Sequence, residues 1–536
     1  MSDPSDETTT GGLVRSSAVV GIGTGLSRVT GLFRTVALTY ALGGAALADG
    51  YNLANTTPNI VYDLLLGGVL SATLVPVFVD RFEHEDDDGV SAVVTVTVAA
   101  LVALTVVAVV AAPLIFKLYT WNKTGSTHDQ ERVGVPLLRF FMPQMLFYGL
   151  TALATAILNA RRRFTWPAFA PVLNNIVVIV ALLWFAQRAG RNPSVDRVVH
   201  DHTLLLLLGL GTTAGIVAMT VVLWPPLRSA GVRLRWRFRP RDPAVRKVAS
   251  LSRWTLGYVV VNQIALTIAL ALANRRDGDV TAYTYAFVFF QLPYGLFAVS
   301  IMTTFTPDLA SAANQGDLPR FRERFALGAR LITLVVLPAS VGYMLLARPL
   351  VTALLAHGSF GGTSPIVTAD VLINFAVGLI GFSLYLYALR GFYAFHDTRT
   401  PFLLNLVENG LNVVLAFALV SHYGVYGVAF SYSAAYLVAG VIALAVLRRR
   451  VGRLGGAELL SACTRIVAAT AVMAGAVWLA SRAVGSDHGT GAVTRVVVGV
   501  LVGTVVYAVA ALALRVDDLR GLRDRLRSRA VRRGDP

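Results

Sequence analysis

Residues 27–76 read SRVTGLFRTVALTYALGGAALADGYNLANTTPNIVYDLLLGGVLSATLVP, and this stretch decides the fold. It is apolar enough to lie in a bilayer, yet it carries Arg28, Arg34, Asp49 and Asp63. An ionised group at bilayer depth is costly, so it normally faces the interior of a helix bundle or a wet cavity. The stretch therefore predicts a polytopic membrane protein with a pathway for something polar.

The composition of the whole chain agrees with a membrane protein. The chain has 536 residues, of which 55% are hydrophobic and 14% charged, and its mean hydropathy is +0.64. Soluble domains carry about 25% charged residues. The net charge of +17 does not indicate a nucleic-acid partner, because the basic residues lie in short loops and in the tail. The single cysteine, Cys463, excludes an intramolecular disulfide. The polar, slightly acidic first dozen residues lack the basic region of a signal peptide, so we expect no cleaved leader.

Hydropathy predicts an all-α protein with fourteen transmembrane helices, each needing about 20 apolar residues. The spans are 14–43, 49–80, 90–118, 134–160, 167–187, 203–226, 251–274, 281–312, 324–347, 366–395, 400–421, 424–447, 459–481 and 493–514. Loops after even-numbered spans, together with the tail, hold about 28 Lys and Arg, against about 11 in the other loops. This asymmetry predicts that the even loops and both termini are cytoplasmic. We expect a multi-pass protein of the cytoplasmic (inner) membrane.

An internal repeat divides the chain. PAFAPVLNN at 167–175 and PFLLNLVEN at 401–409 share a proline and an asparagine eight residues apart, and TLVPVF around Pro76 recurs as TFTPDL around Pro307. Parallel halves of this kind are related by an axis along the membrane normal. We predict two six-helix lobes around a central cavity, plus two extra helices. The predicted boundaries are a polar N-terminus at 1–13, an N-lobe at 14–227, a basic linker at 228–250, a C-lobe at 251–450, the extra helices at 451–515 and a basic tail at 516–536.

The basic linker has two interpretations. Its sequence, RSAGVRLRWRFRPRDPAVRKVAS, combines arginines with aromatic side chains, which suits the anionic cytoplasmic leaflet. It is equally well explained as a positive-inside topology signal and nothing more. The tail from Arg515 to Arg533 alternates Arg with Asp and Leu, as in a short amphipathic surface helix.

A polar stripe follows the second predicted span. Asn52, Asn55, Asn59 and Asp63 are spaced to share one helical face, and Asp49 lies one turn earlier. Asparagines in membrane helices commonly hydrogen-bond neighbouring helices, and that interpretation suffices for any one of them. A stripe that includes two carboxylates favours the lining of a cavity.

Arg28 and Arg34 lie six residues apart on the first span, about 9 Å along a helix and about 120° around it. Gly21, Gly23, Gly25 and Gly31 would allow a bend and close packing, which could turn both side chains inward. Arginine binds phosphate or carboxylate in bidentate fashion. The alternative is an internal pair with Asp49 or Asp63.

The second half carries fewer charges within its spans. Arg390 is a candidate substrate ligand, although near a cytoplasmic helix end it could simply snorkel. Asn405 and Asn409 share a face of the eleventh span, close to Glu408, and Asn262 lies on the seventh. These amides could hold a monovalent cation together with backbone carbonyls, but ordinary helix packing explains them more simply.

Enzyme signatures are missing from the sequence. It contains no P-loop, no HExxH, no Cys/His metal spacing and no G-x-S-x-G motif in a strand–turn–helix context. We therefore expect a transporter without a cofactor, driven by the membrane potential, a cation gradient or the gradient of the substrate.

Several separated motifs resemble the MurJ (MviN) family, the proposed lipid II flippases. They are SRVTGLFRTV, ADGYNLANTTPNIVYDLLLGGVLSATLVPVF, FFMPQMLFYGLTALATAILNARRRFTWPAFAPVLNN, FFQLPYGLFAVSIMTTFTPDLA and LRGFYAFHDTRTPF, within residues 15–450. The resemblance implies the fold of the multidrug/oligosaccharidyl-lipid/polysaccharide exporter superfamily, with two lobes around a V-shaped cavity and two further helices forming a groove for the lipid tail. It also maps the family's first-span arginines onto Arg28 and Arg34, and an aspartate onto Asp49.

Four positions depart from the family pattern. Tyr62 and Asp63 stand where many members have an arginine pair, Gly67 replaces a glutamate, and Val288 stands where an arginine is expected. The predicted cavity thus loses positive charge and gains a carboxylate, a pattern similar to an actinobacterial branch of the family.

The resemblance implies export of lipid II, an undecaprenyl-diphosphate glycolipid, from the inner to the outer leaflet by alternating access, in support of cell-wall synthesis. Membrane lipids and cell-wall synthesis proteins are the other expected partners. The alternatives are an exporter of another polyprenyl-linked glycan or amphipathic molecule, and a non-transporting scaffold or regulator of wall synthesis. A membrane enzyme is the least favoured class.

Overall fold

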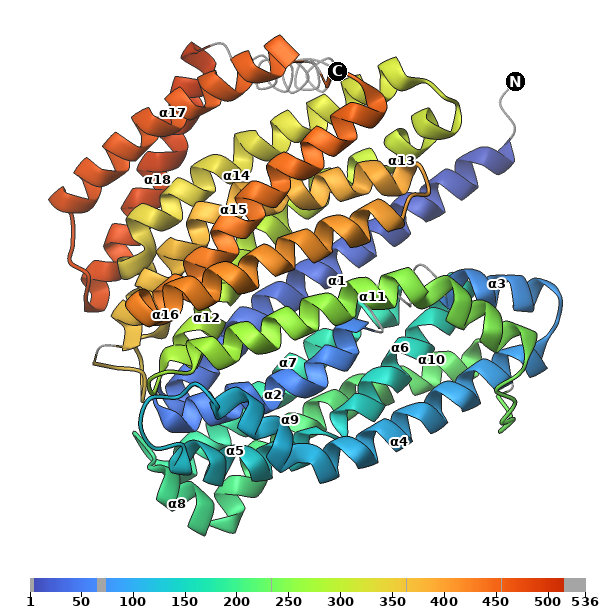
Figure 1. Ribbon diagram of the computed structural model, residues 1–536, viewed down its shortest axis with the longest axis horizontal. Coiled ribbons are helices and arrows are strands. Elements are labelled where there is room, and N and C mark those ends of the chain that lie inside the picture. Colours follow the sequence, from blue (N-terminus) through green and yellow to red (C-terminus); the bar gives the residue numbers. More distant parts are fainter. Residues whose placement is uncertain (1–3, 65–73, 233, 363, 455, 515–536) are drawn as a thin grey trace, which may run out of the picture. The chain divides into compact units, whose positions relative to one another are not determined.

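Helices make up every regular element of the part of the chain that the computed structural model describes (Figure 1). That part comprises residues 4–64, 74–232, 234–362, 364–454 and 456–514, with side chains at 4–20, 60–64, 251–255 and 456–460 left out. The helices of the first half are α1 (Pro4–Leu42), α2 (Ala46–Leu64), α3 (Val75–Glu83), α4 (Asp87–Thr120), α5 (His128–Phe141), α6 (Gln144–Ala160), α7 (Thr165–Ala189), α8 (Val195–His200), α9 (His202–Val221) and α10 (Trp224–Ser229). Those of the second half are α11 (Pro243–Ala273), α12 (Asp279–Pro293), the π-helix η2 (Tyr294–Ala298), α13 (Val299–Asn314), α14 (Leu318–Leu355), α15 (Ser364–Ala394), α16 (Arg399–Val451), α17 (Gly456–Ala483) and α18 (Gly489–Ala513).

Each of the fourteen predicted spans falls on one or more of these helices, which confirms the all-α membrane class. Ten helices of the described residues are long and apolar enough to cross a bilayer, and the bent α15 makes an eleventh. Helix α16 contains two predicted spans, and its backbone breaks at Gly424, where φ is +56° and ψ is −136°. Only glycine adopts that conformation readily, so Gly424 separates the two spans at the predicted position. The first predicted span corresponds to α1, and the ends of the second correspond to α2 and α3, while its residues 65–73 lie outside the described part of the chain.

The chain divides into two compact units, each of which makes most of its residue contacts within itself. Unit 1 comprises residues 1–281 together with His357–Gly361. Within it, α1 packs along α7, α7 along α9, and α2 along α5 (Figure 1). The short segment at 357–361 joins this unit through the backbone N–H of Ser359, which donates to the Tyr40 carbonyl at 3.1 Å. The Ser359 hydroxyl accepts from the Asn192 N–H at 3.0 Å.

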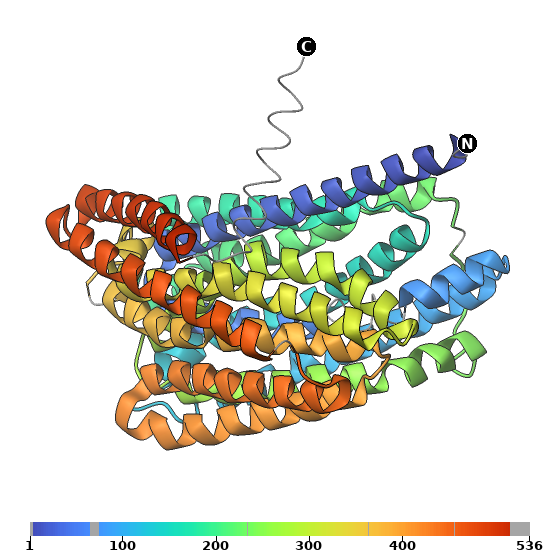
Figure 2. The same ribbon diagram turned by 90° about the horizontal axis from the view of Figure 1, so that it is seen from above.

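Unit 2 comprises residues 282–356 and 362–536. Helices α14, α15 and α16 pack successively, while α17 and α18 pair with each other and lie against α14 (Figure 2). Buried Leu334, Ile466, Ala469 and Ala511 form the contact of the last two helices with α14, and the Tyr507 hydroxyl donates to the Leu334 carbonyl at 2.6 Å. The division into two six-helix lobes with two extra helices, at the boundaries given above, stays a prediction.

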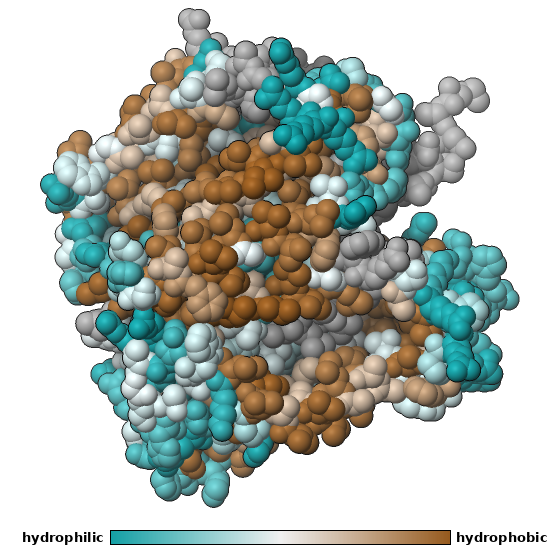
Figure 3. Space-filling model, in the orientation of Figure 1, coloured by the Kyte–Doolittle hydropathy of each residue, from teal (hydrophilic) through white to brown (hydrophobic). Residues whose placement is uncertain are grey.

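Aspartates fix where several helices begin. The side chain of Asp86 accepts from the Gly89 N–H at the start of α4, Asp242 accepts from Ala244 before α11, and Asp317 accepts from Arg320 before α14. Each satisfies a backbone donor that the first helical turn leaves unpaired. Along α4, exposed large apolar side chains run from Val102 to Leu118, and in unit 1 the hydrophilic surface gathers at the helix ends (Figure 3).

Candidate functional site

Asp49, at the start of α2, is fully buried and accepts four hydrogen bonds. Its Oδ1 accepts from the backbone N–H of Thr281 at 2.8 Å and from the Thr281 hydroxyl at 2.6 Å. Its Oδ2 accepts from the Gly278 N–H at 2.6 Å and from Gln130 Nε2 at 3.2 Å. Four donors around one carboxyl group suit an ionised carboxylate, which accepts on both oxygens. The carboxylate therefore joins α2 to α5 and to the turn between α11 and α12.

Two buried amides extend this junction to the end of α4. Gln130 and Asn274 are both buried and exchange two hydrogen bonds, at 3.0 and 3.1 Å. Asn274 Nδ2 also donates to the Tyr119 carbonyl at the end of α4. Nearby, Lys123 Nζ pairs with Asp277 at 2.5 Å, and the Thr124 N–H donates to the Arg275 carbonyl at 3.0 Å. The loops at 121–127 and 274–278 are thereby tied together at the same end of unit 1.

The polar stripe of α2 lies partly within this junction. Asn52 is buried and donates to the Thr281 hydroxyl at 3.2 Å, whereas Asn55 and Asn59 are partly exposed. The Asn59 Oδ1 accepts from the Tyr148 hydroxyl of α6 at 2.7 Å. The side chains of Tyr62 and Asp63, and residue Gly67, lie outside the described part of the chain. Interhelical hydrogen bonding thus accounts for Asn52 and Asn59, and a cavity lining stays a prediction for the stripe.

Arg28 and Arg34 are both half-buried on α1. Helix α1 continues without interruption from Pro4 to Leu42, so helical geometry keeps the two side chains about 120° apart. Tyr51 of α2 is buried, and its hydroxyl is hydrogen-bonded to Thr212 at 2.8 Å. The described hydrogen bonds to Asp49 come from Gln130, Gly278 and Thr281, so the internal arginine–aspartate pair does not form at Asp49.

The seam between α1 and α7 explains the orientation of the first helix. A Cβ on Gly23 would lie 2.8 Å from the Cβ and carbonyl oxygen of Ala168, so the helices approach too closely for any larger residue. Asn175 Nδ2 donates to the Ser27 carbonyl at 3.2 Å and to the Thr30 hydroxyl at 2.9 Å. Gly21 and Gly25 meet nothing within 4 Å, so Gly23 alone of these three requires its small size for packing.

The candidates of the second half lie in unit 2, except Asn262. Arg390 is exposed near the end of α15, while Asn405 and Asn409 are buried on α16. Asn409 Nδ2 donates to the Asn405 carbonyl at 3.0 Å and to Glu408 Oε2 at 2.8 Å. Asn262 is half-buried on α11 of unit 1, so the proposed cation ligands divide between the two units.

Sequence reasoning missed the partners of Asp49. Gln130, Asn274 and Thr281 lie near span ends, where polar residues are ordinary, and nothing local distinguishes them. Their only signal is that two amides and a hydroxyl flank predicted spans 4, 7 and 8. Among the described residues, no group of three or more His, Cys, Asp or Glu side chains could hold a metal ion. The arrangement offers guanidinium and amide groups for binding a polar ligand.

Known proteins resemble this chain along most of its length. The family model described as "Lipid II flippase MurJ" matches residues 38–512. A probable lipid II flippase MurJ of Rhizobium meliloti (strain 1021) is 28% identical over 475 residues, which cover 87% of this chain and 86% of the relative. A solved structure of lipid II flippase MurJ in an inward closed conformation matches with a TM-score of 0.77 at 21% identity, covering 93% of this chain and 99% of that one. An inward-facing MATE family transporter of the MOP superfamily matches with a TM-score of 0.66 at 14% identity, covering 80% of this chain and 96% of that one, and so shares the fold. The chain belongs to the MurJ family.

Proposed function

We propose that this protein flips lipid II from the inner to the outer leaflet of the cytoplasmic membrane by alternating access. The observation that carries the proposal is the family match over residues 38–512, together with two half-buried arginines on α1. A lipid-linked diphosphate carries the negative charge that a pair of guanidinium groups binds. Arg28 and Arg34 would attract the diphosphate, and Asn55 and Asn59 would contact the sugar or peptide. Arg390 and Asp63 complete the proposed ligands.

The Asp49 junction supports a gating step in this mechanism. A transporter that alternates must open at one end while it stays closed at the other. The hydrogen bonds from Thr281, Gly278 and Gln130 bind α2 to the turn at 274–281, and that turn should lie outside if the termini are cytoplasmic. In this proposal Asp49 and Asn52 hold the outer end closed and become available to substrate only when the junction opens.

The energy source belongs to the same proposal. We place a monovalent-cation site at Asn405 and Asn409 of α16, and the membrane potential is the other source that needs no cofactor. Substitution Asn409→Ala should then reduce the dependence of transport on that cation. Substitution of exposed Asn192→Ala, in a loop of unit 1, should leave that dependence unchanged. An unchanged cation dependence in Asn409→Ala would leave the potential as the driving force.

Complementation of a strain depleted of this protein tests the central claim. Depletion should accumulate lipid II in the inner leaflet. Arg28→Ala and Arg34→Ala should each fail to restore growth while reaching wild-type levels in the membrane. The exposed Arg191→Ala is the matched control and should complement. Full complementation by both α1 variants would remove the assigned role of the arginines.

A second candidate keeps the fold and changes the cargo. The observation in its favour is the departure from the family pattern at Tyr62, Asp63 and Val288, which replaces positive charge. The protein would then export another polyprenyl-linked glycan, or act as a non-transporting scaffold of wall synthesis. Purified protein in proteoliposomes separates these outcomes, because a lipid II flippase moves lipid II faster than a related glycolipid and a scaffold moves neither.

A further inference from the structure

The basic linker between α10 and α11 is held against the start of α4. The backbone N–H of Arg235 donates to the Ser91 hydroxyl at 3.2 Å, and that of Arg237 donates to the Thr95 hydroxyl at 3.0 Å. Arg237 also pairs with Asp88 at 2.8 Å. We call residues 234–241 the linker strap.

The spacing of these contacts explains the path of the strap. Ser91 and Thr95 are four residues apart on a helix, which is about 6 Å along its axis. Two residues of an extended chain advance by nearly the same length, about 6.6 Å. The hydroxyls of α4 therefore match alternate N–H groups of a chain that runs extended along the helix.

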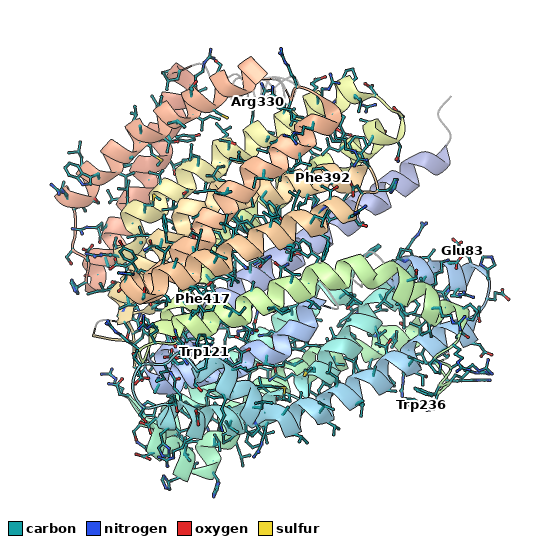
Figure 4. The ribbon with its side chains drawn as sticks, viewed as in Figure 1. Glu83, Trp121, Trp236, Arg330, Phe392 and Phe417 are labelled. Atoms are coloured by element: carbon teal, nitrogen blue, oxygen red, sulfur yellow. The ribbon has the colours of Figure 1, made fainter. Side chains whose placement is uncertain are left out.

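This attachment leaves alternate apolar side chains exposed. Leu234, Trp236 and Phe238 are 39%, 72% and 59% exposed, and the arginines at 235, 239 and 241 are exposed beside them. Figure 4 places Trp236 and Glu83 at one end of unit 1 and Trp121 at the opposite end. Exposed aromatic and basic side chains in one short segment suit a membrane surface, where anionic head groups cover an apolar interior.

The position along α4 indicates what lies against the strap. The exposed large apolar side chains of α4 run from Val102 to Leu118, about 24 Å, which is close to the hydrocarbon thickness of a bilayer. Thr95, which holds the strap, lies about 10 Å before Val102. The strap therefore lies at the depth of the lipid head groups.

Two more exposed tryptophans lie in segments that the predicted topology places on the cytoplasmic side, together with the linker strap. Trp166 lies in the first turn of α7 and Trp224 begins α10, and the Arg228 guanidinium lies 5.0 Å from the Trp224 ring. Arg163 ties these segments together by donating to the carbonyl of Ser229 at 2.9 Å. Tryptophans at the water–lipid boundary form the aromatic belts of membrane proteins.

We propose that the linker strap is a binding element for anionic phospholipid of the cytoplasmic leaflet. Trp236 and Phe238 enter the boundary between head groups and acyl chains, while Arg235, Arg239 and Arg241 bind the phosphates. Charge complementarity favours this occupant, because residues 228–241 contain six arginines and no acidic residue. The linker strap is separate from the proposed substrate ligands, so its binding of lipid does not depend on the cargo.

Fluorescence quenching by brominated lipids tests the proposal. Full-length protein and Trp236→Phe are reconstituted in two kinds of vesicle. In one kind the phosphatidylglycerol carries bromine on its acyl chains, in the other the phosphatidylcholine does, and the brominated fraction is the same in both. The difference in emission between the unsubstituted protein and Trp236→Phe is the contribution of Trp236. We expect brominated phosphatidylglycerol to quench it about twofold more than phosphatidylcholine, since each arginine enriches anionic lipid locally, and we expect high salt to reduce the difference.

Matched variants separate the strap from the net charge of the protein. Arg239→Gln with Arg241→Gln should bring the ratio of the two quenching values close to one. Arg188→Gln with Arg191→Gln, exposed residues around the opposite end of α7, should leave the ratio unchanged. Ser91→Ala with Thr95→Val removes both acceptors and should increase tryptic cleavage within the strap.

Three results would overturn the proposal. Equal quenching by the two lipids would mean that the aromatic residues insert without selecting charge. Absence of quenching would place Trp236 away from the membrane, as expected for a strap that binds an acidic protein or serves only as a topology signal. An equal loss of preference in both arginine pairs would assign the effect to net charge.

Discussion

The carboxylate of Asp49 accepts both the backbone N–H and the hydroxyl of Thr281, a residue 232 positions later in the chain. Both residues are fully buried, and Asn52 donates to the same hydroxyl. An ionised acceptor at this position is costly unless its donors stay in place. The pair therefore holds the start of α12 against the start of α2.

Asp49→Asn should destabilise the protein strongly. Each carboxylate oxygen of Asp49 accepts two hydrogen bonds. Whichever way the asparagine amide is turned, its NH₂ group replaces one of these oxygens and faces two donors, so two hydrogen bonds are lost. Losing two hydrogen bonds to a charged acceptor costs about 3 kcal/mol or more. Thermal unfolding of purified protein in detergent should show a clear drop in Tm, and Thr281→Val should show a smaller one.

The matched control for this experiment is Asp196→Asn. Asp196 is a mostly exposed carboxylate that pairs with Arg132 at the surface. Surface pairs contribute about 1 kcal/mol or less. Equal Tm values for Asp49→Asn and Asp196→Asn would show that the four hydrogen bonds contribute little.

Gly23→Ala should loosen the seam between α1 and α7. The new methyl group would lie 2.8 Å from backbone and side-chain atoms of Ala168, and the backbone atom cannot move aside cheaply. Overpacking of this kind costs about 1–3 kcal/mol. Gly21→Ala and Gly25→Ala meet open space and should gain up to about 1 kcal/mol from the higher helix propensity of alanine. Unfolding midpoints in detergent measure all three, and a neutral Gly23→Ala would contradict the close packing.

Gly424→Ala should strain the break inside α16. The native φ of +56° with ψ of −136° is almost confined to glycine, and another residue there costs about 1–3 kcal/mol. Gly410→Ala lies in the same helix with nothing within 4 Å, so it should be neutral or stabilising. The difference in Tm between the two variants is the measurement, and a more stable Gly424→Ala would mean that the break is not required.

Asp86 should link stability to pH at the start of α4. The hydrogen bond from the Gly89 N–H, followed by the bond and charge of Arg81, lowers the pKa of Asp86, although burial opposes the shift. Because the folded pKa is depressed, the stabilisation is present above the unfolded pKa of about 4 and disappears as pH falls through the folded value. Asp86→Ala should cost about 1 kcal/mol at neutral pH and little at about pH 3. Asp86→Asn keeps an acceptor and should show a smaller loss at neutral pH. A loss for Asp86→Ala that is equally large at both pH values would contradict the linkage.

The sequence by itself determined the membrane class and the helices. A span depends on about 20 consecutive apolar residues, which is a local property, so hydropathy and loop charge were sufficient. The break at Gly424 was predictable for the same reason, since a polar and glycine-containing interruption separates two apolar runs. The arginines of α1 and the stripe of α2 were visible because charged and amide groups are rare in such runs.

Tertiary structure alone decided what those polar groups contact. Asp49 was predicted to contact substrate or an arginine, and the structure instead surrounds it with Gln130, Gly278 and Thr281. It also decided that Ser91 and Thr95 hold the linker strap, and that Gly23, rather than Gly21 or Gly25, packs against α7. Helical periodicity gives the face on which a residue lies but not the element opposite it. Residues 80 or more positions apart meet only through the packing of whole helices, and no local pattern encodes that contact.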